Sequence, residues 1–111
     1  MTAQPRRAIV VSHTHWDREW YLTFARFRVQ LLETVDAVLD ALEHDPDLPH
    51  FCLDGQALAV EDYLAARPEQ EDRVRDLVAS GRLALGPWWI LPDEFLVSGE
   101  ATVRNLQHGH A

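Results

Sequence analysis

The stretch Ala8-Ile9-Val10-Val11-Ser12-His13-Thr14-His15-Trp16-Asp17 decides the fold, because an apolar run leads directly into two histidines and an acid. Its first four residues are apolar and rich in β-branched side chains, which is typical of a strand buried on both faces of a parallel sheet. The polar residues begin where this strand would end. Functional sites in parallel α/β barrels are built at the carboxyl ends of the strands. The stretch therefore predicts an α/β fold with a site that begins near His13.

Strand and helix patterns alternate along the rest of the chain. The clearest helix runs from Val29 to Leu42, where apolar residues keep helical spacing and polar residues occupy the opposite face. Pro68 suits the start of a later helix, Gly81 suits its C-terminal cap, and Ser98 suits the N-terminal cap of the last helix. The expected strands are Ala8–Val11, His50–Leu53 and Arg82–Gly86, and the expected helices are 29–42, 57–65, 68–81 and 98–111. This alternation predicts a parallel sheet with right-handed crossovers.

Two features predict that residues 1–111 form the first part of a larger domain. The last helix pattern reaches Ala111 without a C-terminal cap, and a sheet of three parallel strands would have two unprotected edges. A closed (β/α) barrel typically needs about 250 residues. The predicted fold class is therefore α/β, with the first three β/α units of an incomplete barrel-like domain.

The composition of the chain excludes some classes of partner. A formal net charge of −8 and a pI near 5.0 argue against nucleic acid or an anionic membrane, because either would require a basic surface, whereas a neutral sugar is compatible. The run Ala8–Val11 is too short for the core of a signal peptide, and nothing else approaches a membrane span. Cys52 lies in an apolar run, which predicts a buried free thiol in a reducing compartment. A cytoplasmic location is expected.

The residues that follow the first predicted strand have the chemistry of metal ligands. If the chain stays extended, His13, His15 and Asp17 project from the same side, because side chains alternate along a strand. Imidazole nitrogen and carboxylate oxygen suit zinc, and cobalt, manganese or iron are also compatible. A surface loop can contain the same pattern by accident. Further ligands would have to come from elsewhere in the chain.

The segment His13–Tyr21 resembles the opening of the glycoside hydrolase family 38 α-mannosidases in its bacterial form. The similarity continues through ordered motifs and covers nearly the whole chain from Ile9 onward. These motifs are Leu53-Asp54-Gly55-Gln56, Gly81-Arg82-Leu83, Gly86-Pro87-Trp88 and Ser98-Gly99-Glu100. An ordered series of motifs is far more specific than any one of them. The resemblance implies the N-terminal part of a family 38 catalytic domain.

The resemblance also implies roles for individual residues. His15 and Asp17 match two zinc ligands, and Trp20 matches the aromatic residue that stacks against the bound mannose. His13 matches a family histidine for which a structural hydrogen bond is favoured over direct ligation. The other two ligands, an Asp that is also the nucleophile and a later His, would lie beyond residue 111, as would the general acid/base. The implied reaction is retaining hydrolysis, with the metal holding the 2- and 3-hydroxyls of the sugar.

A second group of interest lies just past the third predicted strand, at Trp88, Trp89, Asp93 and Glu94. Tryptophan beside carboxylates suits a sugar, because the ring packs on C–H surface and the acids accept hydroxyl protons. Trp88 and Asp93 are therefore predicted to bind substrate. The alternative is that the tryptophans are core residues and the acids cap a turn. The segment Asp54-Gly55-Gln56 is expected to form a turn, with a place in the pocket as its alternative.

Taken with the resemblance, these observations predict a zinc-dependent glycosidase that acts on α-mannosides or mannose-containing oligosaccharides when the chain is part of a longer protein. The chain alone is expected to be inactive, because no catalytic residue is predicted within it. A metal-dependent amidohydrolase or deacetylase is an alternative, since such enzymes also place His-x-His after their first strand but rely on a metal-activated water. A truncated fragment without activity is a further alternative.

Overall fold

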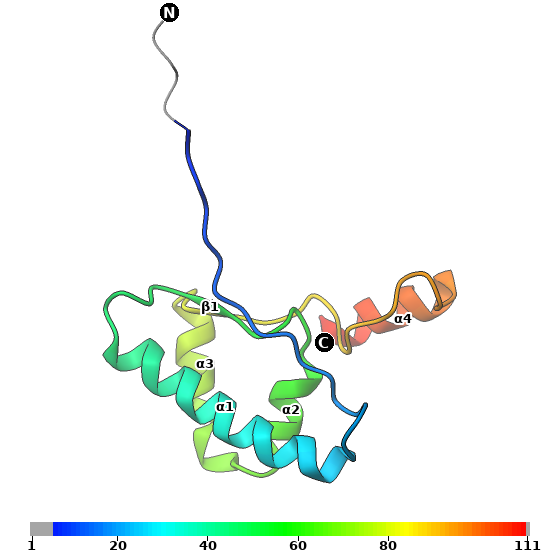
Figure 1. Ribbon diagram of the computed structural model, residues 1–111, viewed down its shortest axis with the longest axis horizontal. Coiled ribbons are helices and arrows are strands. Elements are labelled where there is room, and N and C mark those ends of the chain that lie inside the picture. Colours follow the sequence, from blue (N-terminus) through cyan, green and yellow to red (C-terminus); the bar gives the residue numbers. More distant parts are fainter. Residues whose placement is uncertain (1–5, 111) are drawn as a thin grey trace, which may run out of the picture.

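The computed structural model describes residues 6–110, in which helices and short parallel strands alternate (Figure 1). The chain forms α1 (Phe24–His44), β1 (Phe51–Cys52), α2 (Leu58–Leu64), the 3-10 turn η1 (Pro68–Gln70), α3 (Glu71–Ala79), β2 (Leu83–Ala84) and α4 (Gly99–Gly109). Each predicted helix is present, and two of the three predicted strands are present in shortened form. The α/β class predicted from the sequence is confirmed.

The two strands pair in parallel, with Phe51 opposite Leu83 and Cys52 opposite Ala84. A third segment, residues 12–14, lies on the other edge of β1 and forms a parallel bridge between His13 and Cys52. Two backbone hydrogen bonds hold it there, from Cys52 N to the Ser12 carbonyl (2.9 Å) and from Thr14 N to the Cys52 carbonyl (3.2 Å). Three successive chain segments therefore run side by side in sequence order, connected by α1 and by α2 with α3.

The predicted first strand, Ala8–Val11, is wrong in its position and burial. Residues 6–12 have no strand assignment, and Ile9, Val10 and Val11 are 77%, 81% and 52% exposed. Pairing begins only at residues 12–14, because that is where the chain meets β1. Residues 6–11 run away from the body of the molecule (Figure 1). An apolar run indicates that a segment suits a sheet, but its burial depends on partners that the described residues do not supply.

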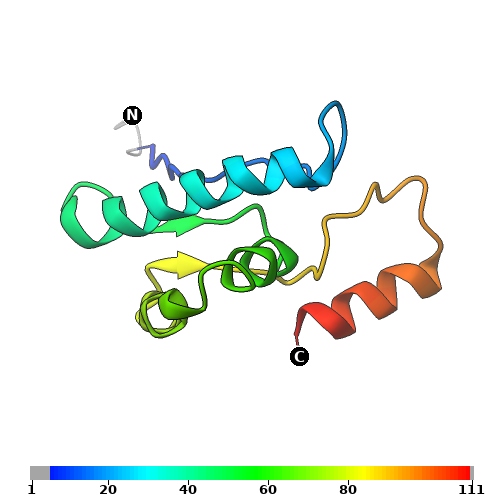
Figure 2. The ribbon, with the colours of Figure 1, turned by 90° about the horizontal axis from the view of Figure 1, so that it is seen from below.

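The helices form a core on one side of the paired segments. Figure 1 shows α1, α2 and α3 together beneath β1, and Figure 2 shows the two strands running in the same direction between α1 and α3. The buried stripe of α1 begins at Phe27, which explains why the helix starts earlier than predicted, at Phe24. The core cluster consists of Leu31, Val35, Val38, Leu39, Leu42, Leu53, Ala59, Val60, Tyr63, Val74, Leu77 and Leu83.

The predicted helix caps behave as their residue types require. Gly81 has a φ of 74°, and the hydrogen bonds from Arg82 N to the Leu77 carbonyl and from Gly81 N to the Val78 carbonyl (both 3.0 Å) close α3. Ser98 caps α4, since its hydroxyl accepts a hydrogen bond from Ala101 N at 3.2 Å. The expected extension of this helix to the end of the chain is wrong, because α4 ends at Gly109, and Ala111 lies outside the described residues.

The expected burial of Cys52 is also wrong, because the residue is only partly buried. Successive side chains of a strand point to opposite faces, so Cys52 faces away from the helices while its neighbour Leu53 enters the core.

None of the helices within residues 6–110 is both long enough and apolar enough to cross a membrane.

Candidate metal and sugar site

The polar residues that follow the His13–Cys52 bridge form a loop, residues 14–20, here called the motif loop. Within it, His15 Nε2 and Asp17 Oδ1 lie 3.6 Å apart. Their side chains are 67% and 37% exposed, so both are accessible to a further group. The structure therefore brings together the two residues predicted as ligands.

A second carboxylate approaches the same histidine from the turn after β1. Asp54 Oδ1 lies 3.8 Å from His15 Nδ1, and the Asp54 side chain is only 7% exposed. His15 thus has a carboxylate facing each ring nitrogen. His13 behaves differently, because it is exposed and its Nδ1 pairs with the neighbouring Thr14 carbonyl at 2.7 Å.

The geometry of His15 and Asp17 fits two ligands of one zinc ion. Zinc–nitrogen and zinc–oxygen bonds of about 2.0–2.1 Å in a tetrahedral arrangement place neighbouring ligand atoms about 3.3 Å apart. The observed separation of 3.6 Å is close to this value. Within residues 6–110, however, no three His, Cys, Asp or Glu side chains are grouped so that they could hold a metal ion. These residues match part of a metal site and do not complete one.

The turn after β1 holds the motif loop by the backbone of Trp16, the residue between the two candidate ligands. Asp54 Oδ2 accepts a hydrogen bond from Trp16 N at 2.6 Å, and Gln56 Nε2 donates to the Trp16 carbonyl at 2.8 Å. The turn predicted at Asp54-Gly55 is present, with left-handed φ values of 50° and 66°. Gln56 is 2% exposed and also lines a cavity, so this segment both turns the chain and contributes to the site.

A partly buried ion pair holds the motif loop at Arg18. Arg18 donates through Nε and Nη2 to the two carboxylate oxygens of Asp62 on α2, at 2.7 and 3.1 Å. Its guanidinium also lies 4.2 Å from the ring centroid of Phe24, at the start of α1. The hydrogen bonds to Asp62 raise the pKa of Arg18 above its ordinary value. The motif loop is therefore held at Trp16 by the turn after β1 and at Arg18 by α2 and α1.

Next to the motif loop lies a cavity of about 290 Å³ that contains Asp17. It is lined by Trp16, Asp17, Arg18, Glu19, Gln56, Ile90 and Leu91. Trp20 is not among its lining residues; this side chain is 75% exposed and meets Tyr21 edge to face at 5.6 Å. Within residues 6–110, then, the predicted stacking residue has an open ring surface and few protein contacts.

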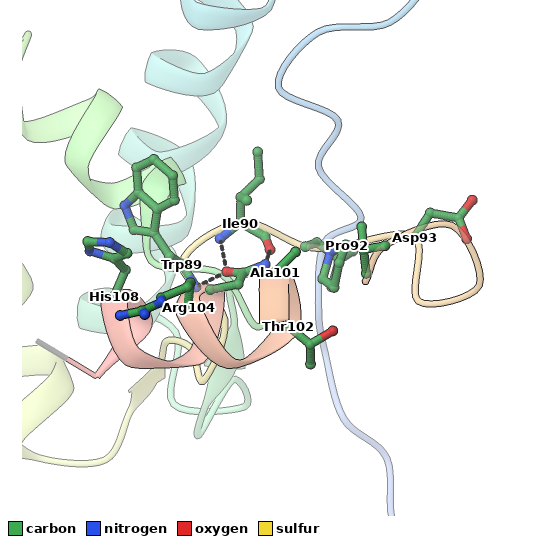
Figure 3. Close-up of a pocket in the computed structure, with 11 residues that line it drawn as sticks. Trp89, Ile90, Pro92, Asp93, Ala101, Thr102, Arg104 and His108 are labelled. Carbon is green, nitrogen blue, oxygen red and sulfur yellow. Dashed lines mark hydrogen bonds between the residues drawn. The ribbon is translucent and has the colours of Figure 1, made fainter. Parts of the chain in front are cut away.

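A larger groove of about 530 Å³ lies between the loop 89–93 and α4 (Figure 3). Asn105 fixes this loop, because its Oδ1 accepts from Trp89 N and Ile90 N (both 2.9 Å) and its Nδ2 donates to the Ile90 carbonyl (2.6 Å). Figure 3 shows Trp89 beside His108 at one end of the groove and Asp93 at the other. The lining is mainly apolar and includes one predicted substrate residue, Asp93.

The tryptophans of this region do not belong to the core. Trp88 is half-buried and lines neither cavity; its backbone pairs with the turn after β1, through Trp88 N to the Gly55 carbonyl (3.1 Å) and Ala57 N to the Trp88 carbonyl (2.8 Å). Trp89 lines the larger groove and donates from Nε1 to Glu61 at 3.1 Å. Of the two tryptophans, Trp89 alone lines one of the two cavities described above.

Comparison with known proteins decides the family. The model of the glycosyl hydrolases family 38 N-terminal domain matches residues 5–111. This chain belongs to glycosyl hydrolase family 38. The match supports the glycosidase prediction over the amidohydrolase alternative, and it agrees with the motif series that begins at His13.

Two solved structures and a curated relative are similar to this family 38 domain. The crystal structure of an α-mannosidase from Enterococcus faecalis V583 matches with a TM-score of 0.86 and 50% sequence identity. The crystal structure of a second family 38 protein from Enterococcus faecalis matches with a TM-score of 0.81 and 46% sequence identity. A protein named "Putative mannosylglycerate hydrolase" from Halalkalibacterium halodurans is 48% identical over 104 residues. The matches cover 90–94% of this chain but only 11–12% of the relatives, so the chain spans about an eighth of their length or less.

The family 38 domain also contains contacts between site residues that the sequence did not predict. Arg18 and Asp62 are 44 positions apart, and Gln56 reaches Trp16 across 40 positions. No local periodicity connects such pairs, because they meet only once β1 lies beside the motif loop. The one available signal was that Asp54-Gly55-Gln56 closes a strand neighbouring the histidine motif.

Proposed function

We propose that this chain is the N-terminal part of a longer, retaining glycosidase that hydrolyses α-mannosidic bonds. The observation that carries the proposal is the 3.6 Å separation of His15 Nε2 and Asp17 Oδ1 within a family 38 domain. The three parallel segments (residues 12–14, β1 and β2) support a barrel-like arrangement in which these would be the first β/α units. The names of the relatives support mannosides as the substrate class.

The donor set supports zinc, and it is also compatible with cobalt, manganese or iron. His15 through Nε2 and Asp17 through Oδ1 would hold the ion together with ligands from the rest of the protein. Bound zinc would supply a Lewis acid that holds sugar hydroxyls. Trp20 would offer its open ring to the apolar face of the sugar, which fixes the plane of the ring relative to Asp17.

The carboxylates that perform the reaction are proposed to lie outside this chain. Retaining hydrolysis needs one carboxylate to attack the anomeric carbon and a second to protonate the leaving oxygen, at a separation of about 5–5.5 Å. Two acids that contact the motif loop are already engaged, because Asp54 receives hydrogen bonds and Asp62 pairs with Arg18. The residues of this chain would therefore bind and orient the sugar, and Trp88 and Asp93 are proposed to contact it further from the metal.

The test compares the full-length protein with residues 1–111 alone. We expect the full-length protein to bind zinc in titration calorimetry and to release nitrophenol from an aryl α-mannoside, and to lose both properties as His15→Ala or Asp17→Asn. Residues 1–111 alone should do neither, because stable zinc sites generally use three or four ligands. Mannosylglycerate, tested in parallel, separates the two activities named for the relatives. Turnover by residues 1–111 that disappears in His15→Ala would contradict the proposal.

A further inference from the structure

The backbone of Trp16 is held from both sides by side chains of a different chain segment. Its N–H donates to Asp54 Oδ2 at 2.6 Å, and its carbonyl accepts from Gln56 Nε2 at 2.8 Å. Trp16 is the single residue between His15 and Asp17, so these two hydrogen bonds fix both peptide units that separate the candidate ligands. The spacing of the ligands is therefore set by the turn after β1.

Gln56 is built into this arrangement with all its hydrogen-bonding atoms in use. Its side-chain nitrogen donates to the Trp16 carbonyl and to Asp54 Oδ2 (2.9 Å), and its oxygen accepts from Leu91 N (3.2 Å). The residue is 2% exposed, and a buried amide is stable only when it is fully paired. One buried side chain thus connects the motif loop, the turn after β1 and the loop that follows β2.

Asp54 performs two tasks with its two oxygens. Oδ2 receives the hydrogen bonds from Trp16 N and Gln56, while Oδ1 faces His15 Nδ1 at 3.8 Å. A carboxylate beside the far nitrogen of a metal-binding histidine favours one orientation of the ring. The backbone of Asp54 is left-handed, with a φ of 50°, a conformation that Asp and Asn tolerate better than most residues.

We propose that Asp54 and Gln56 are positioning residues that set the separation and orientation of His15 and Asp17 for the metal. This inference rests on the proposed function, because it takes His15 and Asp17 as ligands. Neither positioning residue touches the metal or the sugar in this assignment. Gln56 acts through the Trp16 backbone, and Asp54 acts through both that backbone and the His15 ring.

The test measures zinc affinity on full-length protein stripped of metal, by competition with a chromophoric chelator, together with the visible spectrum of the cobalt(II)-loaded protein. Gln56→Glu keeps the shape but removes both donated hydrogen bonds, and we expect zinc affinity to fall about 10- to 100-fold and the cobalt spectrum to change. Gln56→Met removes the same bonds without burying a charge, so it decides the question if Gln56→Glu does not fold. Asp54→Asn retains an oxygen acceptor and should lie between wild type and Gln56→Met.

The control variant is Tyr63→Phe, which removes a short hydrogen bond, from Tyr63 OH to Asp36 (2.6 Å), from a side chain that is also buried. It should lower the unfolding temperature of the metal-free protein while leaving zinc affinity and the cobalt spectrum unchanged. If Gln56→Met folds and binds zinc with wild-type affinity while His15→Ala loses zinc, the positioning role is overturned and the ligand assignment stands. Undiminished zinc in His15→Ala would overturn the ligand assignment of the proposed function, and the positioning role with it.

Discussion

Replacing Trp20 by alanine in the full-length protein separates sugar stacking from every other role of the motif loop. The side chain is 75% exposed and its aromatic neighbour is Tyr21, met only edge to face at 5.6 Å. Removal of so exposed a ring should change the free energy of unfolding by no more than about 0.5 kcal/mol. The proposed ligand atoms of His15 and Asp17 make no contact that depends on the Trp20 ring in the described residues, so zinc binding should be unaffected.

The effect on substrate should be larger than the effect on stability. Aromatic packing contributes about 0.5–1.5 kcal/mol, which corresponds to a fall of about 2- to 13-fold in kcat/KM. Because the contact would exist before and during the reaction, most of the loss should appear as a higher KM. The measurement pairs steady-state kinetics on an aryl α-mannoside with metal analysis of the same sample.

The matched control is Phe95→Ala, which removes another exposed aromatic ring, 99% accessible, from the loop before α4. It should leave KM and zinc content at wild-type values. Loss of zinc in Trp20→Ala would show that the residue supports the metal site. A wild-type KM in that variant would refute the stacking role.

Two further predictions concern the ion pairs. Asp62→Asn weakens the bidentate contact with Arg18, and because Arg18 is 40% exposed the cost in free energy should be about 1 kcal/mol. This loss should appear as about fivefold faster hydrogen exchange in the motif loop. The control Glu71→Gln, which removes an exposed ion pair on α3, should not change that exchange. The hydrogen bond from Arg73 lowers the pKa of Glu43, so the charged pair stabilises the folded state above about pH 4.5 and loses this contribution as the pH falls through the lowered pKa. Glu43→Gln should therefore lower the unfolding temperature at pH 7, by an amount equivalent to less than about 1 kcal/mol. The difference from wild type should shrink as the pH falls through the lowered pKa of Glu43, and a difference that grows as the pH falls would contradict the assignment.

The sequence by itself determined the features that depend on near neighbours. The apolar stripe of α1 has a helical period, so its buried face could be predicted from Leu31, Val35 and Leu42. The caps at Gly81 and Ser98 followed from the conformations that those residue types favour. The two candidate ligands could be named together because they are only two positions apart in an extended segment.

Only the tertiary structure decided which distant segments meet. Pairing of residues 12–14 with β1 places Asp54 beside His15 and Gln56 against the Trp16 backbone, over 38 to 40 positions of sequence. The same pairing leaves Val10 exposed, although its side chain is apolar, because no described segment covers it. Periodicity and residue type indicate what a segment can bury or bind. Contact between two distant segments also requires the fold to bring them together, so hydrogen bonds such as that from Gln56 to Trp16 form only after the chain has folded.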